Sequence, residues 1–106
     1  FGLRHGPAFR RFGLTELPVT GVPSAPWDIL DTWGFFQAPD RHLTPADYLR
    51  EAQDLADLAG RAGAGVINVY GDPVHVHGRD EFFDAVAAWA AVAEPVGYDD
   101  LMERMR

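Results

Sequence analysis

The sequence contains no cysteine among its 106 residues. Disulfide bonds, zinc sites built on thiolates and a thiol nucleophile are therefore excluded. Secreted and cytosolic proteins can both lack cysteine, so the absence identifies no compartment. The sequence carries no prediction of localisation.

Positive charge is also scarce. The nine Lys and Arg residues are outnumbered by 16 Asp and Glu residues, and the net charge is -7. Arg4, Arg10 and Arg11 form a short basic patch, but no basic stripe is present that would displace counterions from phosphates. We therefore expect no nucleic-acid partner.

Long apolar runs are missing as well. No window approaches the roughly 18 apolar residues that span a bilayer, and the start lacks the charged-then-apolar pattern of a secretory signal. We expect no membrane partner. Because the chain begins with Phe1 and not Met, we expect a processed or truncated form of a longer protein.

The remaining composition is that of a globular domain. Hydrophobic residues make up 47% of the sequence and aromatic residues 12%, which suffices for a modest core at this length. We expect residues 1–106 to form a single domain or the C-terminal portion of a larger one.

Two helices are clearly indicated. Thr44 supplies an N-cap hydroxyl, Pro45 suits the first helical position, and Asp47 places an acid in the first turn. Apolar residues then recur at three- and four-residue spacing, with Glu51 on the predicted outer face. Residues 80–93 form a second apolar stripe of helical period.

Extended segments alternate with these helices. The pattern predicts strands at residues 14–20, 65–70 and 96–98, the last of them followed by a terminal helix, and residues 21–43 predict a long aromatic loop with several prolines. Strands alternating with helices imply parallel pairing through right-handed crossovers. The predicted fold class is therefore α/β, with parallel strands and crossover helices forming part of a barrel or an open sheet.

The most informative stretch is residues 65–79, an apolar run that ends in ionisable side chains. Its first residues suit a strand buried on both faces, which is typical of a parallel sheet covered by helices. Ligands in such sheets gather beyond the carboxyl ends of the strands, where Asp72, His75 and His77 would lie. These three residues are the candidate catalytic residues.

Each candidate also has a simpler interpretation. On an extended backbone, His75 and His77 would lie on one face and could act as acid, base or metal ligands, although a zinc site needs a third protein ligand. They could equally be solvated loop histidines. Asp72 before Pro73 could simply open a turn, and Arg79 could bind a substrate carboxylate or be a surface cation.

The aromatic loop offers a second kind of site. Trp27, Trp33, Phe35 and Phe36 could provide flat faces on which a sugar ring stacks. The alternative is that these residues fold the loop back onto the core. We single out Trp27, Trp33 and Arg79 as candidate substrate-binding residues.

The order of these segments resembles the C-terminal half of a polysaccharide deacetylase, a family-4 carbohydrate esterase. The resemblance rests on residues 17–21, the aromatic loop, the helix capped by Pro45 and residues 68–75, and it extends from about Leu14 to the final helix. It implies a partial (β/α) barrel of the polysaccharide deacetylase type, of which residues 1–106 would be the C-terminal portion.

The resemblance also implies a reaction. Members of this family hydrolyse the N-acetyl amide of an amino sugar with an aspartate base, a divalent zinc-like metal held by Asp and two His, and a late histidine acid. The late histidine corresponds to His75; in a second alignment Asp72 takes its place and His75 is a neighbour, and His77 is a further candidate. The family's early Asp-Asp and His-x-x-x-His motifs, which supply the base and the metal ligands, have no match in these residues.

Two consequences and two alternatives follow. The metal ligands would lie outside this segment, so we expect it to be inactive alone and to pair with a missing N-terminal half or another chain, with carbohydrate as substrate. One alternative is a non-catalytic α/β interaction module that exposes Trp27, Trp33 and Phe36 to a partner or glycan. The other is an unrelated metal-dependent hydrolase with His75 and His77 as ligands.

Overall fold

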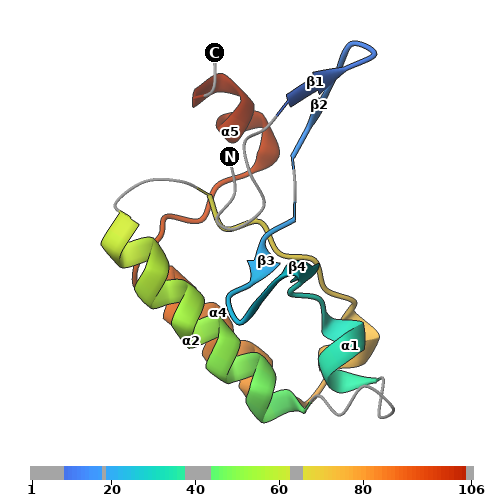
Figure 1. Cartoon of the computed structure of the whole chain (residues 1–106), viewed down its shortest axis with the longest axis vertical. Helices are drawn as coiled ribbons and strands as arrows, with labels where there is room; N and C mark the ends of the chain where they lie inside the picture. The colour runs from blue at the N-terminus through green and yellow to red at the C-terminus, as the bar shows by residue number, and fades with distance from the viewer. Residues whose placement is uncertain (1–8, 18, 38–43, 63–65, 105–106) are drawn as a thin grey trace.

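The computed structural model describes residues 9–17, 19–37, 44–62 and 66–104. Helices and strands follow one another along the chain, with the long helix α2 and the helix α4 behind it as the largest pair (Figure 1). Their bounds are β1 Phe9–Arg11, β2 Leu14–Glu16, β3 Gly21–Val22, β4 Ala25–Ile29, α1 Thr32–Phe36, α2 Pro45–Ala62, α3 Pro73–Val76, α4 Asp80–Ala90 and α5 Tyr98–Arg104.

The predicted partial (β/α) barrel with parallel strands is wrong. Within the described ranges the chain is a mostly helical small domain with five helices, and its strands form two separate antiparallel hairpins, β1–β2 and β3–β4. These strands are two to five residues long. Two-stranded hairpins of this length depend on packing against helices for stability.

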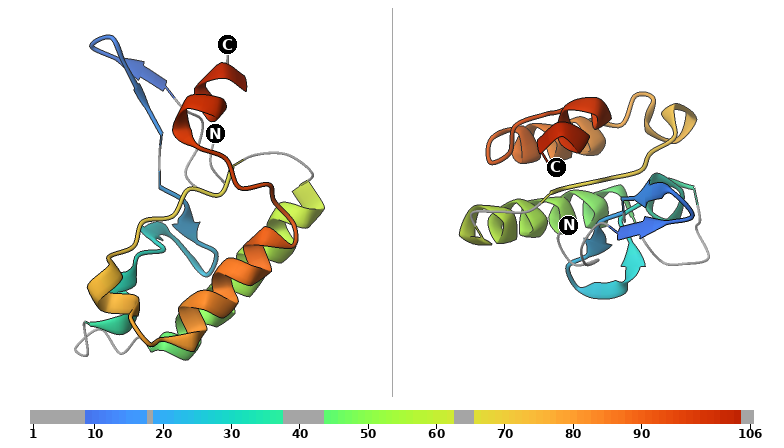
Figure 2. Two further views of the ribbon diagram at one scale, coloured as in Figure 1. Left: turned by 180° about the vertical axis from the view of Figure 1, so that it is seen from behind. Right: turned by 90° about the horizontal axis from the view of Figure 1, so that it is seen from above.

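The hairpin β1–β2 contains the first three residues of the predicted strand at 14–20. Its two turn residues, Phe12 and Gly13, have φ values of 52° and 78°. Positive φ at both central positions is the conformation that matches the right-handed twist of two adjacent strands. In two views this hairpin projects away from the helical layers (Figures 1 and 2).

The predicted buried strand at 65–70 is wrong in its described part, residues 66–70. Asn68 does pair with Thr20, whose N–H donates to the Asn68 carbonyl at 2.7 Å. The Asn68 N–H, however, donates to the Thr20 hydroxyl at 2.9 Å and not to a backbone carbonyl. Because a side chain takes the place of a backbone acceptor, the ladder stops there, and only an isolated parallel bridge between Asp31 and Tyr70 follows.

Burial along the same segment also differs from the prediction. Val66, Ile67 and Val69 are half-buried, and Tyr70 is 57% exposed. A strand buried on both faces would be covered by helices on each side. This segment has α4 and α5 on one side, and on the other the layer that holds the hairpins and α2 (Figure 2). A groove remains open along residues 66–69.

The predicted long loop at 21–43 contains regular structure in its described part. Residues 21–29 form the β3–β4 hairpin, and α1 follows it directly. Asp31 caps α1, since its carboxylate accepts the Gly34 N–H at 3.2 Å. The aromatic residues Phe35 and Phe36 of α1 lie in the core.

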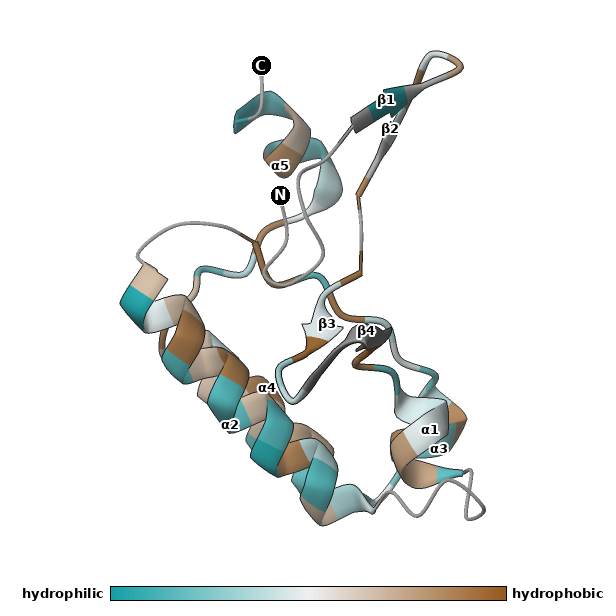
Figure 3. Ribbon diagram, viewed as in Figure 1, coloured by the Kyte–Doolittle hydropathy of each residue, from teal (hydrophilic) through white to brown (hydrophobic). Residues whose placement is uncertain are grey.

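The helix α2 begins where the sequence predicts. Its buried face consists of Tyr48, Ala52, Leu55 and Ala56, and hydrophilic and hydrophobic residues alternate along it (Figure 3). Glu51 is the exception, because it was expected on the outer face and is only 4% exposed. A buried carboxylate requires hydrogen-bond partners, and the turn of the β3–β4 hairpin supplies them.

The core lies between α2, α4 and α1. Trp89 of α4 is buried, and its indole Nε1–H donates to the Ala52 carbonyl of α2 at 3.1 Å. The Tyr48 ring is the centre of the aromatic packing. Its neighbours are Phe35, Phe36, Phe82 and Trp89, with centroid separations between 5.2 and 6.2 Å.

The described helices include none that is long and apolar enough to cross a membrane.

Candidate functional site

The start of α1 lies against the segment that contains the candidate catalytic residues. Thr32 is fully buried, and its Oγ1 lies 2.9 Å from Nδ1 of His75. The same oxygen accepts the Asp72 N–H at 2.9 Å. We call these three residues the Thr32–Asp72–His75 cluster.

The backbone explains how Asp72 and His75 reach this position. Asp72 is the N-cap of α3, with its carboxylate accepting the Val74 N–H at 3.0 Å and Pro73 at the start of the helix. The Asp72 carbonyl accepts the His75 N–H at 3.0 Å. The Asp72 carboxylate is therefore engaged in turn geometry, while its backbone N–H is engaged by Thr32.

Close packing at Gly71 keeps this cluster together. A Cβ added at Gly71 would lie 3.1 Å from Cγ2 of Thr32, which is tighter than an ordinary van der Waals contact. A side chain at residue 71 would therefore push the loop away from Thr32.

The two histidines do not share a face. The prediction assumed an extended backbone, but residues 73–76 are helical, so residues two apart point in different directions. His75 is half-buried and contacts Thr32, whereas His77 is the exposed C-cap of α3. Only His75 is brought into the cluster.

The described residues do not fit a metal. No group of three or more His, Cys, Asp or Glu side chains in these ranges is placed to hold a metal ion. Nδ1 of His75 already has Thr32 as its partner. The zinc-like metal implied by the family resemblance therefore has no ligand set in the part of the chain that the structure describes.

The predicted substrate-binding residues are dispersed or outside the described set. Trp33 of α1 is 49% exposed and follows Thr32 directly in sequence. Arg79 is exposed and precedes α4 without a side-chain capping bond. The Trp27 side chain lies outside the described residues, and Phe36, expected to be exposed in the interaction-module alternative, is buried in the core.

Sequence reasoning missed Thr32. The sequence around Thr32 predicts only local structure, since Asp31 before a short aromatic segment suggests a helix cap. It gives no indication of a contact with a histidine 43 residues away. Sequence reasoning also missed the electrostatic interaction between Asp31 and Tyr48, a residue of the core. Burial raises the pKa of Tyr48, and the negative charge of Asp31 raises it further.

A groove of about 700 Å³ runs along residues 66–69. Its walls come from α2, α4 and α5, and its apolar surface includes Val86, Val92, Val96 and Tyr98. The Arg104 guanidinium holds Glu94 at one side through two hydrogen bonds of 3.1 and 3.2 Å, which lowers the pKa of Glu94. None of the candidate catalytic residues lines this groove.

Comparison of the chain with protein-family models, with curated proteins and with solved structures found no match.

Proposed function

We propose that this chain is the part of an amide hydrolase that supplies the proton to the leaving amine, with an N-acetylated amino sugar as substrate and His75 as the proton donor. The observation that carries the proposal is the setting of His75. Its Nδ1 is 2.9 Å from a buried hydroxyl, and among the described residues Nε2 of this half-buried ring has no hydrogen-bond partner. The family resemblance of the sequence supplies the substrate class.

The chemistry needs one proton at the nitrogen that leaves. Water adds to the amide carbonyl and releases its protons to solvent, the C–N bond breaks, and the electron pair of that bond remains on nitrogen. The protonated His75 ring gives its Nε2 proton to this nitrogen, so that acetate and a free amine are released and the ring regains a proton from solvent. Histidine is the residue type used most often as a general acid or base in proteins.

The test uses the full polypeptide that contains this sequence, incubated with an N-acetylglucosamine oligomer and added zinc or cobalt. Acetate release is measured. His75→Gln is expected to reduce the rate by roughly 10²- to 10⁴-fold, the usual contribution of a positioned acid. His77→Gln is the matched control and is expected to retain activity, because His77 is exposed at the end of α3.

Two results would overturn the proposal. One is the absence of acetate release by the full polypeptide with either metal. The other is equal activity of His75→Gln and the unaltered protein. Loss of activity in His77→Gln alone would move the proton-donor role to His77.

A second candidate function is glycan binding without catalysis, and the observation that favours it is the half-exposed indole of Trp33. An exposed aromatic face can stack on a sugar ring. Titration calorimetry with the same oligomer is expected to show binding that Trp33→Ala removes and His75→Gln retains. Binding of that kind without acetate release would favour this function over hydrolysis.

A further inference from the structure

We propose that Thr32 is a positioning residue that fixes which nitrogen of His75 faces a bound ligand. The inference rests on the proposed function of His75 and adds a residue that sequence reasoning did not select. It starts from the contact between Thr32 Oγ1 and His75 Nδ1 at 2.9 Å.

Hydrogen-bond accounting assigns the roles in this contact. Thr32 has one hydroxyl hydrogen and two acceptor lone pairs. The Asp72 backbone N–H can only donate, so at 2.9 Å it takes one lone pair of Oγ1. The hydroxyl hydrogen is then available to His75 Nδ1, its other partner among the described residues.

The burial of Thr32 favours the assignment in which its hydroxyl donates to Nδ1 of neutral His75. Thr32 is fully buried, so its hydroxyl hydrogen has no access to water. If neutral His75 instead carried its proton on Nδ1, two donors would face Oγ1 and the hydroxyl hydrogen would lose its acceptor. A buried donor without an acceptor is unfavourable, so the neutral ring carries its proton on Nε2.

In the charged ring the direction of this contact is reversed. The Nδ1–H then donates to the second lone pair of Oγ1, and the Thr32 hydroxyl hydrogen is left without His75 as its acceptor. In both states Nδ1 faces Thr32, and Nε2 carries a proton toward the surroundings. Thr32 thereby presents His75 as a donor, which is the role that protonation of a leaving amine requires.

Gly71 extends the positioning to the backbone. Its missing side chain lets the loop approach Thr32, because a Cβ there would lie 3.1 Å from Thr32 Cγ2. The Asp72 N–H can then reach the hydroxyl and hold it in orientation. The orientation of His75 therefore depends on the loop as well as on the two side chains.

The experiment is long-range ¹H–¹⁵N correlation NMR of the full polypeptide labelled at histidine, recorded at alkaline pH. His75→Gln assigns the resonance. The expected result is a proton on Nε2 and an Nδ1 signal shifted by hydrogen bonding. A proton on Nδ1 in the unaltered protein would overturn the proposal without any variant and without substrate.

Two variants separate positioning from a purely structural role. Thr32→Val keeps the shape but removes the hydroxyl, and the Nδ1 signal is expected to move to that of an unbonded nitrogen; Thr32→Ser is expected to restore it. An unchanged Nδ1 signal in Thr32→Val would also overturn the proposal.

The kinetic outcome is read separately from the NMR result. In the full polypeptide, Thr32→Val is expected to lower kcat by up to the order of 10²-fold, the scale of a small misplacement, with little change in KM. If the NMR result holds but the protein releases no acetate, the positioning role stands and the proposed hydrolase function fails.

Discussion

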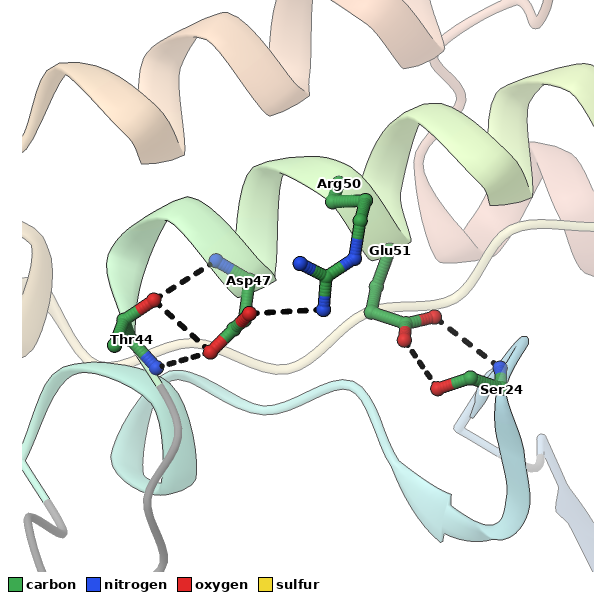
Figure 4. Close-up of polar contacts among 5 residues, drawn as sticks. All are labelled: Ser24, Thr44, Asp47, Arg50 and Glu51. Carbon is green, nitrogen blue, oxygen red and sulfur yellow. Dashed lines mark hydrogen bonds and ion pairs between the residues drawn. The ribbon is translucent and has the colours of Figure 1, made fainter.

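Two carboxylates on α2 bind the hydroxyl and backbone N–H of a Ser or Thr, and they differ in almost every other respect (Figure 4). Asp47 binds Thr44, three residues away, and its side chain is 22% exposed. Glu51 binds Ser24, 27 residues away, and is buried. The same chemistry thus caps the start of a helix in one place and joins two distant elements in the other.

The local pair follows directly from sequence. Thr44 Oγ1 accepts the Asp47 N–H at 3.1 Å, and the Asp47 carboxylate accepts the Thr44 N–H at 2.8 Å. These reciprocal bonds satisfy donors that the first turn of a helix leaves unpaired. The distant pair has no such signature, because nothing near Glu51 in the sequence marks the turn that it contacts.

The largest effect is expected for Glu51→Ala. The change removes the acceptor for the Ser24 N–H, at 3.2 Å, and for the Ser24 hydroxyl. We expect a loss of about 2 kcal/mol in the free energy of unfolding, the scale of hydrogen bonds to a charged group, measured by urea denaturation. Asp54→Ala, which removes an exposed carboxylate from the same helix, is the control and should change stability by less than about 0.5 kcal/mol.

Equal losses for Glu51→Ala and Asp54→Ala would contradict this interpretation. A double-mutant cycle with Ser24→Ala measures the coupling, which is expected to be non-additive because the two residues share bonds.

A smaller effect is expected for Asp47→Ala. Loss of a helix cap costs about 1 kcal/mol, and Thr44→Ala should cost a similar amount because the two residues cap the helix reciprocally. The hydrogen bond from the Thr44 hydroxyl, assisted by the backbone of Thr44 and by Arg50 at 2.8 Å, lowers the pKa of Asp47.

The lowered pKa gives this contribution a pH dependence. A carboxyl group with a pKa lower in the folded than in the unfolded state stabilises the fold above its ordinary pKa, and the stabilisation is lost as pH falls through the folded value. The stability difference between the unaltered protein and Asp47→Asn should therefore be constant near neutral pH and shrink below about pH 4. A difference that grew on acidification would have the wrong sign.

The smallest effect is expected for Tyr48→Phe. The Tyr48 hydroxyl is buried and has no hydrogen-bond partner in the part of the chain that the structure describes. Its removal should change the unfolding free energy by between about 0 and 1 kcal/mol in the stabilising direction, since an unsatisfied buried group is removed and the ring remains. Thermal unfolding measures this, and a loss above about 1 kcal/mol would reveal a partner for the hydroxyl.

The sequence predicts features that depend on neighbours in the chain. The start of α2 at Pro45, its apolar face and the helix at Asp80–Ala90 follow from caps and periodicity over a few residues. The fold class does not follow, because the apolar pattern at 65–70 is also that of a half-buried segment whose pairing depends on Thr20.

The candidate site divides in the same way. The sequence selects His75 and Asp72 and suggests the turn at Pro73. It places His77 beside His75 because it treats residues 72–77 as extended. The sequence of this short segment does not distinguish an extended backbone from the single helical turn that forms there. It cannot select Thr32, whose importance comes from burial and from a contact across 43 residues.

The bond between Ser24 and Glu51 also has a consequence for amide hydrogen exchange. The Ser24 N–H lies in an exposed turn, where exchange with solvent is ordinarily fast. Its acceptor, however, is a buried carboxylate of the longest described helix. The turn amide should therefore exchange only when the hairpin separates from α2, so that one surface residue reports the opening of the interface between them.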